Sequence, residues 1–574
     1  MTTGRKNVAI GYDAFGVAQD VDNCVVIGHS ALDACNSSDA DGTVAVGYYA
    51  LSENTSGTEN TALGYHALKD NVDGDRNTAI GYKALQDMTG GSGGNTMVGW
   101  IAGEEITTGA YNTGVGYGAV GGAGSTDNPL TGSGNTAVGY AAGYKLEGNG
   151  YGNTFMGKNC GYNTAAGHSN IAIGQSAFQT AGTNNDIDKV IAIGVEAMYT
   201  SDDAHVDGSI AIGYRALKFN TVGRYNVAIG LDALYTNVDG DGNTAVGYQS
   251  LQTFEADTDG HGRNTGLGTA SGKYISTGTG NTALGANALE GVSGTEITGD
   301  NNTAVGYQAG VLVRGATSGN TLIGALSGDA ITTGENNTAL GASALSANET
   351  SDNNVAVGKE AGKLCTSTQN VFLGTLAGNA VTSGRDNVII GYGSDGALDK
   401  DNQIAIGHNA TGAEDNTIVI GDGITNSTTD TFAFGKASNI ATSSAFTNSG
   451  SCTFAFSSDR RKKQNIKNGE LGLEFINKLQ YRTFNWKPSN EFPKEWNDYN
   501  EENTMNLDKV HHGFIAQEVK EVLDEYGVAD EMDVWSEDAD GMQRLAETKL
   551  ITPLIKAVQE LSKEIKELKN KIGE

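Results

Sequence analysis

The feature that most constrains the fold is a five-residue motif that returns 25 times between residues 7 and 435. It reads asparagine, threonine or valine, alanine, an aliphatic residue and glycine, as in Asn60–Gly64 and again in Asn77–Gly81. The commonest step between motif glycines is 17 residues, with excursions to 23 and a shortening to 14 at the end. A fixed short period is typical of a solenoid, in which each repeat packs only on its neighbours. The chain is therefore expected to be mainly β.

The motif itself predicts a short strand. The residue before the glycine is large and apolar in every copy, and the residue three before it is usually threonine or valine. These two positions alternate with a small residue, so they point to one face of a strand. After the glycine, a small residue and then leucine, phenylalanine or methionine recur in many copies. This second pattern predicts another short strand with a tight inner face.

Asparagine stands four residues before the glycine in 18 copies. Stacked coils place these residues in a ladder at a spacing of about 4.8 Å, where amides can bond one another and the turn backbone. The threonines Thr61, Thr78, Thr96 and Thr113 form a similar ladder. Flat threonine arrays are known from ice-binding proteins, but we interpret this one as structural. The stretches rich in aspartate, glycine and asparagine between motifs predict turns.

Composition supports a repetitive architecture up to residue 457. Of 82 glycines, 76 precede Ser458, but only one of four prolines does, which excludes collagen and proline-rich linkers. This part has 19 basic and 44 acidic residues, a net of −25 within a total of −31. A surface so acidic repels phosphate backbones, so nucleic acid is not expected as a partner.

Cysteine usage and hydropathy bear on where the chain is made. The five cysteines form no CxxC pair, so neither a disulfide framework nor a zinc site is expected, and the chain is expected to be made in a reducing cytosol. No apolar signal region follows Met1, and no apolar run of 18 residues is present. We therefore expect neither secretion by a signal peptide nor membrane insertion.

The motif resembles the head repeat of trimeric autotransporter adhesins, over roughly residues 7–435. The resemblance implies a left-handed parallel β-roll assembled as a homotrimer. At roughly 4.8 Å per coil, 25 coils give a shaft about 120 Å long. The signal peptide, stalk and membrane barrel of that family are not found in this sequence. A cellular adhesin is therefore a weaker alternative.

After residue 457 the sequence changes to an ordinary mixed α/β pattern. Residues 471–479 have helical spacing, residues 481–486 alternate as a strand, and residues 487–509 predict a loop. A strand at 513–515 enters a helix at 516–523. Apolar residues then recur at steps of 3 and 4 over a helix at about 549–573: Ile551, Leu554, Val558, Leu561, Ile565, Leu568 and Ile572. Isoleucine at both seam positions favours a coiled coil of three or more strands. The alternative is one amphipathic helix packed on its own domain.

The junction carries a serine followed five residues later by a lysine, Ser458 and Lys463, in a basic run. Together with the stretch His512–Val519, it resembles the C-terminal intramolecular chaperone domain of phage tailspikes and tail fibres, the endosialidase-type peptidase family S74. That family usually reads Ser-Asp-Arg-Arg-Leu-Lys-Glu-Asn-Ile. Here Lys462 replaces the leucine and Gln464 the glutamate, and neither change touches the serine or the lysine.

The resemblance implies that the domain cuts itself off between Ser457 and Ser458. Ser458 is the expected nucleophile and Lys463 its base, because a neutral lysine amine can take a hydroxyl proton. Nearby positive charge favours the neutral amine. Ser457 is an alternative nucleophile, although it stands outside the family register. A second alternative is that the domain assists folding but does not cleave the chain. Possible supporting residues are His512, Gln517 and Glu518, although His511 and His512 could equally pack or cap the helix. No cofactor and no metal are expected, since the nine-residue calcium-roll pattern is absent.

These observations divide the chain into a repeat shaft at 1–435, a linker at 436–457 and an autopeptidase chaperone domain at 458–574. We interpret it as a phage tail fibre, made in the host cytoplasm and carried on the virion. Its expected partners are two further copies, other virion tail proteins and a host-surface receptor, either a glycan or an outer-membrane protein. A tailspike depolymerase is the main alternative, but the repeats show no distinctive insertion that would house a carboxylate pair.

Overall fold

The computed structural model divides the chain into two compact units, residues 1–457 and 458–574. The residues that the structure describes are 4–17, 20–36, 40–121, 128–179, 187–201, 206–256, 260–437, 439–443, 454–456, 463–496, 498–538 and 541–573.

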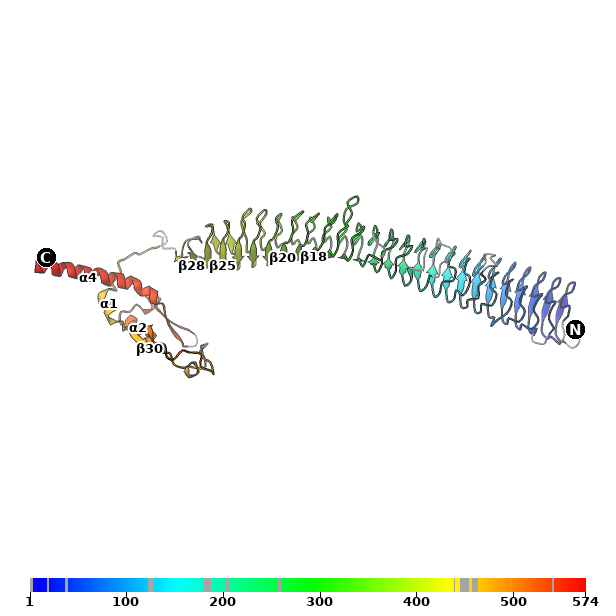
Figure 1. Ribbon diagram of the computed structural model, residues 1–574, viewed down its shortest axis with the longest axis horizontal. Helices are drawn as coiled ribbons and strands as arrows, with labels where there is room; N and C mark the ends of the chain where they lie inside the picture. The colour runs from blue at the N-terminus through cyan, green and yellow to red at the C-terminus, as the bar shows by residue number, and fades with distance from the viewer. Residues whose placement is uncertain are drawn as a thin grey trace. The chain divides into compact units, whose positions relative to one another are not determined.

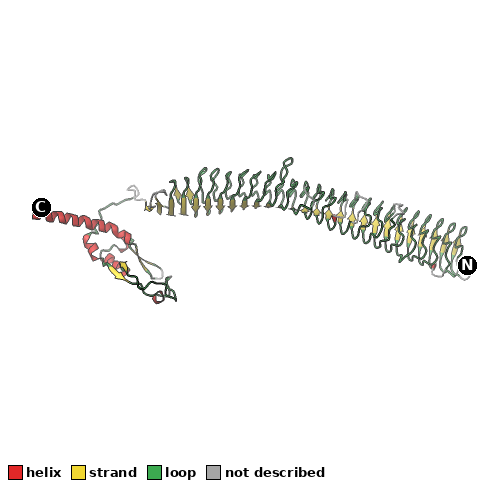
Figure 2. Cartoon of the chain, viewed as in Figure 1, coloured by secondary structure: helices red, strands yellow, loops and turns green. Residues whose placement is uncertain are grey.

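The first unit is a parallel β-solenoid of about 24 turns (Figure 1). Each motif contributes one short strand to a single sheet that runs the length of the unit (Figure 2). The strands are β1 (Val8–Ile10), β2 (Val25–Ile27), β3 (Val44–Val46), β4 (Thr61–Leu63), β5 (Thr78–Ile80), β6 (Thr96–Val98), β7 (Thr113–Val115), β8 (Thr136–Val138), β9 (Thr154–Met156), β10 (Ile171–Ile173), β11 (Ile191–Ile193), β12 (Ile210–Ile212), β13 (Val227–Ile229), β14 (Thr244–Val246), β15 (Thr265–Leu267), β16 (Thr282–Leu284), β17 (Thr303–Val305), β18 (Thr321–Ile323), β19 (Thr338–Leu340), β20 (Val355–Val357), β21 (Val371–Leu373), β22 (Val388–Ile390), β23 (Ile404–Ile406), β25 (Ile418–Asp422) and β27 (Phe432–Lys436).

These strands pair in parallel and in register, motif position to motif position. Ala62 lies beside Ala79, and Leu63 lies beside Ile80. The same alignment holds where the spacing stretches to 23 residues, with Val115 beside Val138. The variable residues are therefore accommodated in the turns, and the prediction of a mainly β solenoid is confirmed.

The interior of each turn is thin and apolar. The middle strand residue, usually alanine, is buried, as are the small and large residues three and four positions after the glycine, such as Ala67 and Leu68. One chain of contacts between such residues runs from Phe15 to Ile424. A narrow alanine-rich interior lets the two sides of a turn approach closely, so each turn gains little burial alone and depends on its neighbours.

The predicted second strand after the glycine is wrong for most turns. The second and fourth residues after the glycine adopt left-handed backbone angles, with φ of 56° at His66 and 50° at Leu68. Such angles interrupt an extended strand, so this segment is a series of turns whose N–H groups bond the coils on both sides: His66 donates to Tyr48 of the preceding coil and Leu68 donates to Ala84 of the following coil. Short paired segments appear on this side only near the end, as β24 (Thr411–Gly412) and β26 (Thr425–Asn426), among the described residues.

The predicted asparagine ladder is confirmed. The Oδ1 atom of Asn60 accepts the backbone N–H of Asn77 at 2.9 Å, and its Nδ2 donates to the carbonyl of Gly74 at 2.8 Å. The Nδ2 of Asn95 reaches Oδ1 of Asn77 at 3.0 Å. These asparagines are buried, so each amide satisfies backbone groups that would otherwise be left without partners inside the coil.

The motif glycines form a second column beside the asparagines. Their φ angles lie between 131° and 153°, in a region that side chains rarely adopt. A Cβ built on Gly230 would lie 2.3 Å from the carbonyl oxygen of Gly247 in the next turn. Glycine is therefore required at this position by both backbone angle and close approach.

The last parallel strand, β27, pairs on its far side with antiparallel β28 (Asn439–Ser443), which pairs with β29 (Phe454–Phe456). The segment 436–457, predicted as a linker, therefore contains strands that continue the sheet. Its departure from the repeat is real, because the parallel stacking ends at β27.

The second unit is a small α+β region followed by a long helix. Its elements are α1 (Leu473–Lys478), β30 (Arg482–Phe484), η4 (Ser489–Glu491), β31 (His511–Gly513), α2 (Ala516–Glu525), α3 (Ala529–Met532), β32 (Trp535–Glu537), β33 (Gln543–Leu545), η5 (Glu547–Leu550) and α4 (Ile551–Ile572). Its core consists of Phe475, Val519, Leu523, Val534 and Leu550. The β32–β33 hairpin was not predicted. None of the described helices is long and apolar enough to cross a membrane.

The glycine column yields a first prediction. Gly230→Ala should lower the free energy of unfolding of the shaft by at least about 1–3 kcal/mol, since the backbone angle alone costs that much for a residue with a Cβ. Gly134→Ala is the matched control: Gly134 also has a positive φ, 69°, but its added Cβ would meet nothing within 4 Å. Thermal unfolding followed by circular dichroism measures both. Equal losses from the two variants would contradict a requirement set by the close approach of neighbouring turns.

The asparagine ladder yields a second prediction. Asn337→Ala removes the acceptor of the Asn354 backbone N–H and the donor to the Ser351 carbonyl. Leaving a buried group without a partner costs about 1–3 kcal/mol, so guanidinium unfolding should show a loss of at least that size. Thr333→Ala, at an exposed position of the same turn, should change stability little. A loss no larger than that of the control would show that the ladder contributes nothing.

Candidate functional site

The predicted cleavage residues Ser457 and Ser458 lie outside the described residues, as does the basic run up to Lys462. Lys463 is the first residue described after them, and its side chain is exposed. The distance between the predicted nucleophile and its base is therefore not part of the described geometry, and the dyad stays a prediction.

The predicted supporting residue His512 lies on β31, which pairs with β30 so that His512 faces Thr483 across the ladder. Its Nδ1 lies 2.7 Å from the hydroxyl of Tyr481, and the two rings stack. The neighbouring His511 packs against Phe484 and Trp486. Both histidines thus pack on aromatic side chains at the β30–β31 pair, which agrees with the alternative that they have a packing role.

The predicted supporting residue Glu518 lies in the first turn of α2. Its two carboxylate oxygens accept hydrogen bonds from Arg482 at 2.9 and 2.8 Å. This hydrogen bond to the guanidinium lowers the pKa of Glu518 below its ordinary value. The paired arrangement fixes α2 against β30 and occupies the carboxylate. Gln517, the third predicted supporting residue, is exposed on the same helix.

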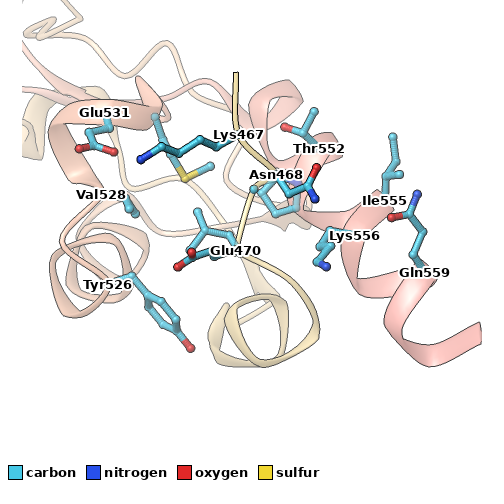
Figure 3. A pocket seen from close by; sticks show the side chains of 14 residues that line it. Lys467, Asn468, Glu470, Tyr526, Val528, Glu531, Thr552, Ile555, Lys556 and Gln559 are labelled. Carbon is cyan, nitrogen blue, oxygen red and sulfur yellow. The ribbon is translucent and has the colours of Figure 1, made fainter. Parts of the chain in front are cut away.

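The segment that follows the predicted dyad lines an open groove of about 1090 Å³ (Figure 3). Lys467 and Glu470 contribute from this segment, Glu531 from α3, and Thr552 and Lys556 from the start of α4. The groove contains charged groups of both signs and no cysteine, histidine or serine among its lining residues. Its lining therefore offers no serine–histidine or cysteine–histidine pair for acyl transfer.

Helix α4 is tied to the rest of the unit by a carboxylate that the sequence did not reveal. Glu560 accepts the backbone N–H of Leu473, at the start of α1, at 2.6 Å. That bond is the main reason why the pKa of Glu560 lies below its ordinary value. The contact joins residues 87 positions apart, so it gives no periodic signal in the sequence. It positions one side of α4 against α1 while other sides stay open.

The open side of α4 carries the predicted seam. All seven predicted seam residues are exposed in the single chain, from 41% at Leu561 to 71% at Ile572. Within the unit, α4 buries only Pro553 and Ala557 fully among its described residues. An amphipathic helix packed on its own domain would bury this apolar stripe, so the structure disfavours that alternative.

The strand face of the solenoid is a second open apolar surface. The large residue before each motif glycine points away from the interior, and many of these side chains are exposed, such as Leu63 at 46%, Leu340 at 44% and Leu373 at 45%. Because the strands stack in register, these side chains form an unbroken aliphatic column along the shaft. Apolar surfaces of this extent on soluble proteins commonly mark contacts with other chains.

Comparison with known families finds a match to part of the second unit. Residues 458–528 match the family model Peptidase_S74, described as the chaperone of endosialidase. No curated protein matches the chain. The chain thus combines a parallel β-solenoid with a C-terminal segment that is similar to the endosialidase-type chaperone, and the match begins at Ser458.

Proposed function

We propose that this chain is a phage tail fibre protein, assembled as a homotrimer, whose C-terminal domain aligns three chains and then releases itself. The observation that carries the proposal is the pairing of two open apolar surfaces with an endosialidase-type chaperone domain. Among the described residues, the predicted seam of α4 and many side chains of the aliphatic column are exposed.

Three parallel copies satisfy both surfaces together. Isoleucine at both heptad positions of α4 favours an assembly of three or more parallel helices. A threefold axis along the shaft then brings three identical aliphatic columns together, and each buried column removes its apolar surface from water. One threefold symmetry can therefore cover both surfaces.

The repeats explain why such a fibre needs a chaperone. Turns that share one motif can pair one repeat out of step with nearly the same contacts, and such errors trap folding. A domain that trimerises first brings the three chains into register before the shaft folds. Its contribution is then complete, so its removal leaves the folded shaft in place.

The release step is a single acyl transfer in each chain. The neutral amine of Lys463 takes the hydroxyl proton of Ser458, and the oxygen attacks the carbonyl carbon of Ser457. The amide C–N bond breaks, the Ser458 nitrogen gains a proton, and an ester joins the two residues. Water then hydrolyses this ester and frees both products. Each chain cuts once, so the reaction is maturation and not turnover.

The mature shaft has the properties of an attachment fibre. It is long and strongly acidic, and its turns place many loops on the outside. On the virion it binds a host-surface receptor, a glycan or an outer-membrane protein, and joins other tail proteins.

The seam yields a third prediction. Replacing Leu561 and Ile565 together with aspartate places six charges on the axis of a trimer and should abolish soluble trimers. Lys563→Asp, on an exposed side of the same helix, should be mild. Light scattering of the soluble fraction measures the assembly. Similar trimer yields from both variants would mean that α4 does not join the chains.

Self-release yields a fourth prediction. Intact mass should show a 457-residue shaft and a 117-residue fragment, the lengths set by a break after Ser457 in the 574-residue chain. Ser458→Ala should give a full-length, still trimeric product, and Lys463→Ala should stop or severely slow the break, because an unassisted hydroxyl is a poor nucleophile near neutral pH.

Lys462→Ala is the control for this pair, since it removes a neighbouring charge and should leave the break intact. The same two fragments from Ser458→Ala would assign the cut to a contaminating protease and refute the dyad.

A further inference from the structure

The residue that follows the motif glycine is aromatic in each of the first eight turns. The eight rings belong to Tyr12, His29, Tyr48, Tyr65, Tyr82, Trp100, Tyr117 and Tyr140. Each ring stacks on the next, with centroids 4.7–5.7 Å apart and planes within 26° of parallel. We call these eight residues the ring column.

The ring column ends at the ninth turn, where Lys158 takes the same position. Beyond it, tyrosines such as Tyr214, Tyr248 and Tyr307 recur at this position without a ring in the turn before or after them, and near the end Tyr392 and His408 form a single stacked pair. The strand motif itself continues unchanged to β27. The first third of the shaft thus differs from the rest in one surface property that the folding of the turns does not require.

The ring column is aromatic, exposed and continuous with the aliphatic column. Tyr82 is 39% exposed and Trp100 is 45% exposed in the single chain. Leu63 and Tyr65 are both exposed and flank Gly64 in one turn, so the two columns run side by side.

We propose that the ring column is an interchain contact, in which the columns of three copies of this chain meet and clamp the first third of the shaft. The proposal rests on the trimer proposed above. A parallel trimer brings identical positions to the same height, so rings meet rings in every one of the eight turns. Stacking within each chain leaves mainly ring edges outward, and edges are favourable partners for the faces and edges of other rings.

This contact makes the association of the three chains stronger in the first third of the shaft than in the rest. Once the C-terminal domain leaves, α4 no longer joins the chains, and the shaft depends on its own contacts. Aromatic contacts are stronger than aliphatic ones of equal area, so dissociation should begin at the end nearest the released domain and the first eight turns should separate last.

The indole of Trp100 reports on this contact directly, because it is the only tryptophan among the first 457 residues. The full chain is made with Trp486, Trp496 and Trp535 replaced by phenylalanine, and its trimeric state is checked by light scattering. Trp100 should then lose most of its quenching by iodide, compared with the same chain unfolded in guanidinium. If Trp100 in the intact trimer is still quenched by iodide, the proposed interchain contact is wrong. The same holds if Trp100 is protected only after a host polysaccharide is added, because the column would then bind glycan and not another chain.

A pair of variants tests the strength of the clamp. Tyr82→Ala removes a ring with two stacked neighbours, and Tyr214→Ala removes a similarly exposed tyrosine beyond the column, which contacts Arg215. Tyr82→Ala should raise the dissociation rate of the trimer in detergent at least about tenfold over Tyr214→Ala, since each substitution occurs three times per trimer. If the two variant trimers dissociate at equal rates, the proposed interchain contact is wrong. If the unsubstituted protein is a monomer, the proposed trimer itself is wrong.

Discussion

The whole shaft depends on the alignment of equivalent backbone groups in successive turns. Each three-residue strand is too short to be stable alone, and its hydrogen bonds come from the turns on either side. The motif glycine allows neighbouring turns to approach, and the buried asparagine satisfies the backbone groups that this approach encloses. The two residues are complementary, because a side chain at the glycine would separate the turns and break the asparagine bonds.

This alignment determines the surface as well as the interior. Any residue type that recurs at an outward position becomes a column, so the shaft displays stripes of aliphatic and aromatic side chains. Stripes of this kind match a partner that has the same repeat, and in the proposed trimer the two further copies of the chain provide it. Equivalent turns also make errors of register easy, and a chaperone domain at the C-terminus is a physical answer to that difficulty.

The sequence predicted those features that repeat or that obey a helical period. The short strand, the ladder through Asn77 and the apolar stripe of α4 all have a local pattern, and the structure contains each of them. The second strand was predicted wrongly because apolar spacing does not reveal left-handed backbone angles such as that of Leu68. The Glu560 contact with α1 and the Arg482–Glu518 pair join distant residues without a periodic signal. The dyad rests on family resemblance, since Ser458 lies outside the described residues.

The central claim is that a trimeric shaft forms under the control of a domain that then leaves. Native mass spectrometry of the purified, unboiled protein tests both parts in one spectrum. The account predicts one dominant species with the mass of three chains, each ending at Ser457, and a separate species for the 117-residue domain that the remaining sequence defines. A dominant species made of a single chain, or a trimer of chains that all retain residues 458–574, would contradict it.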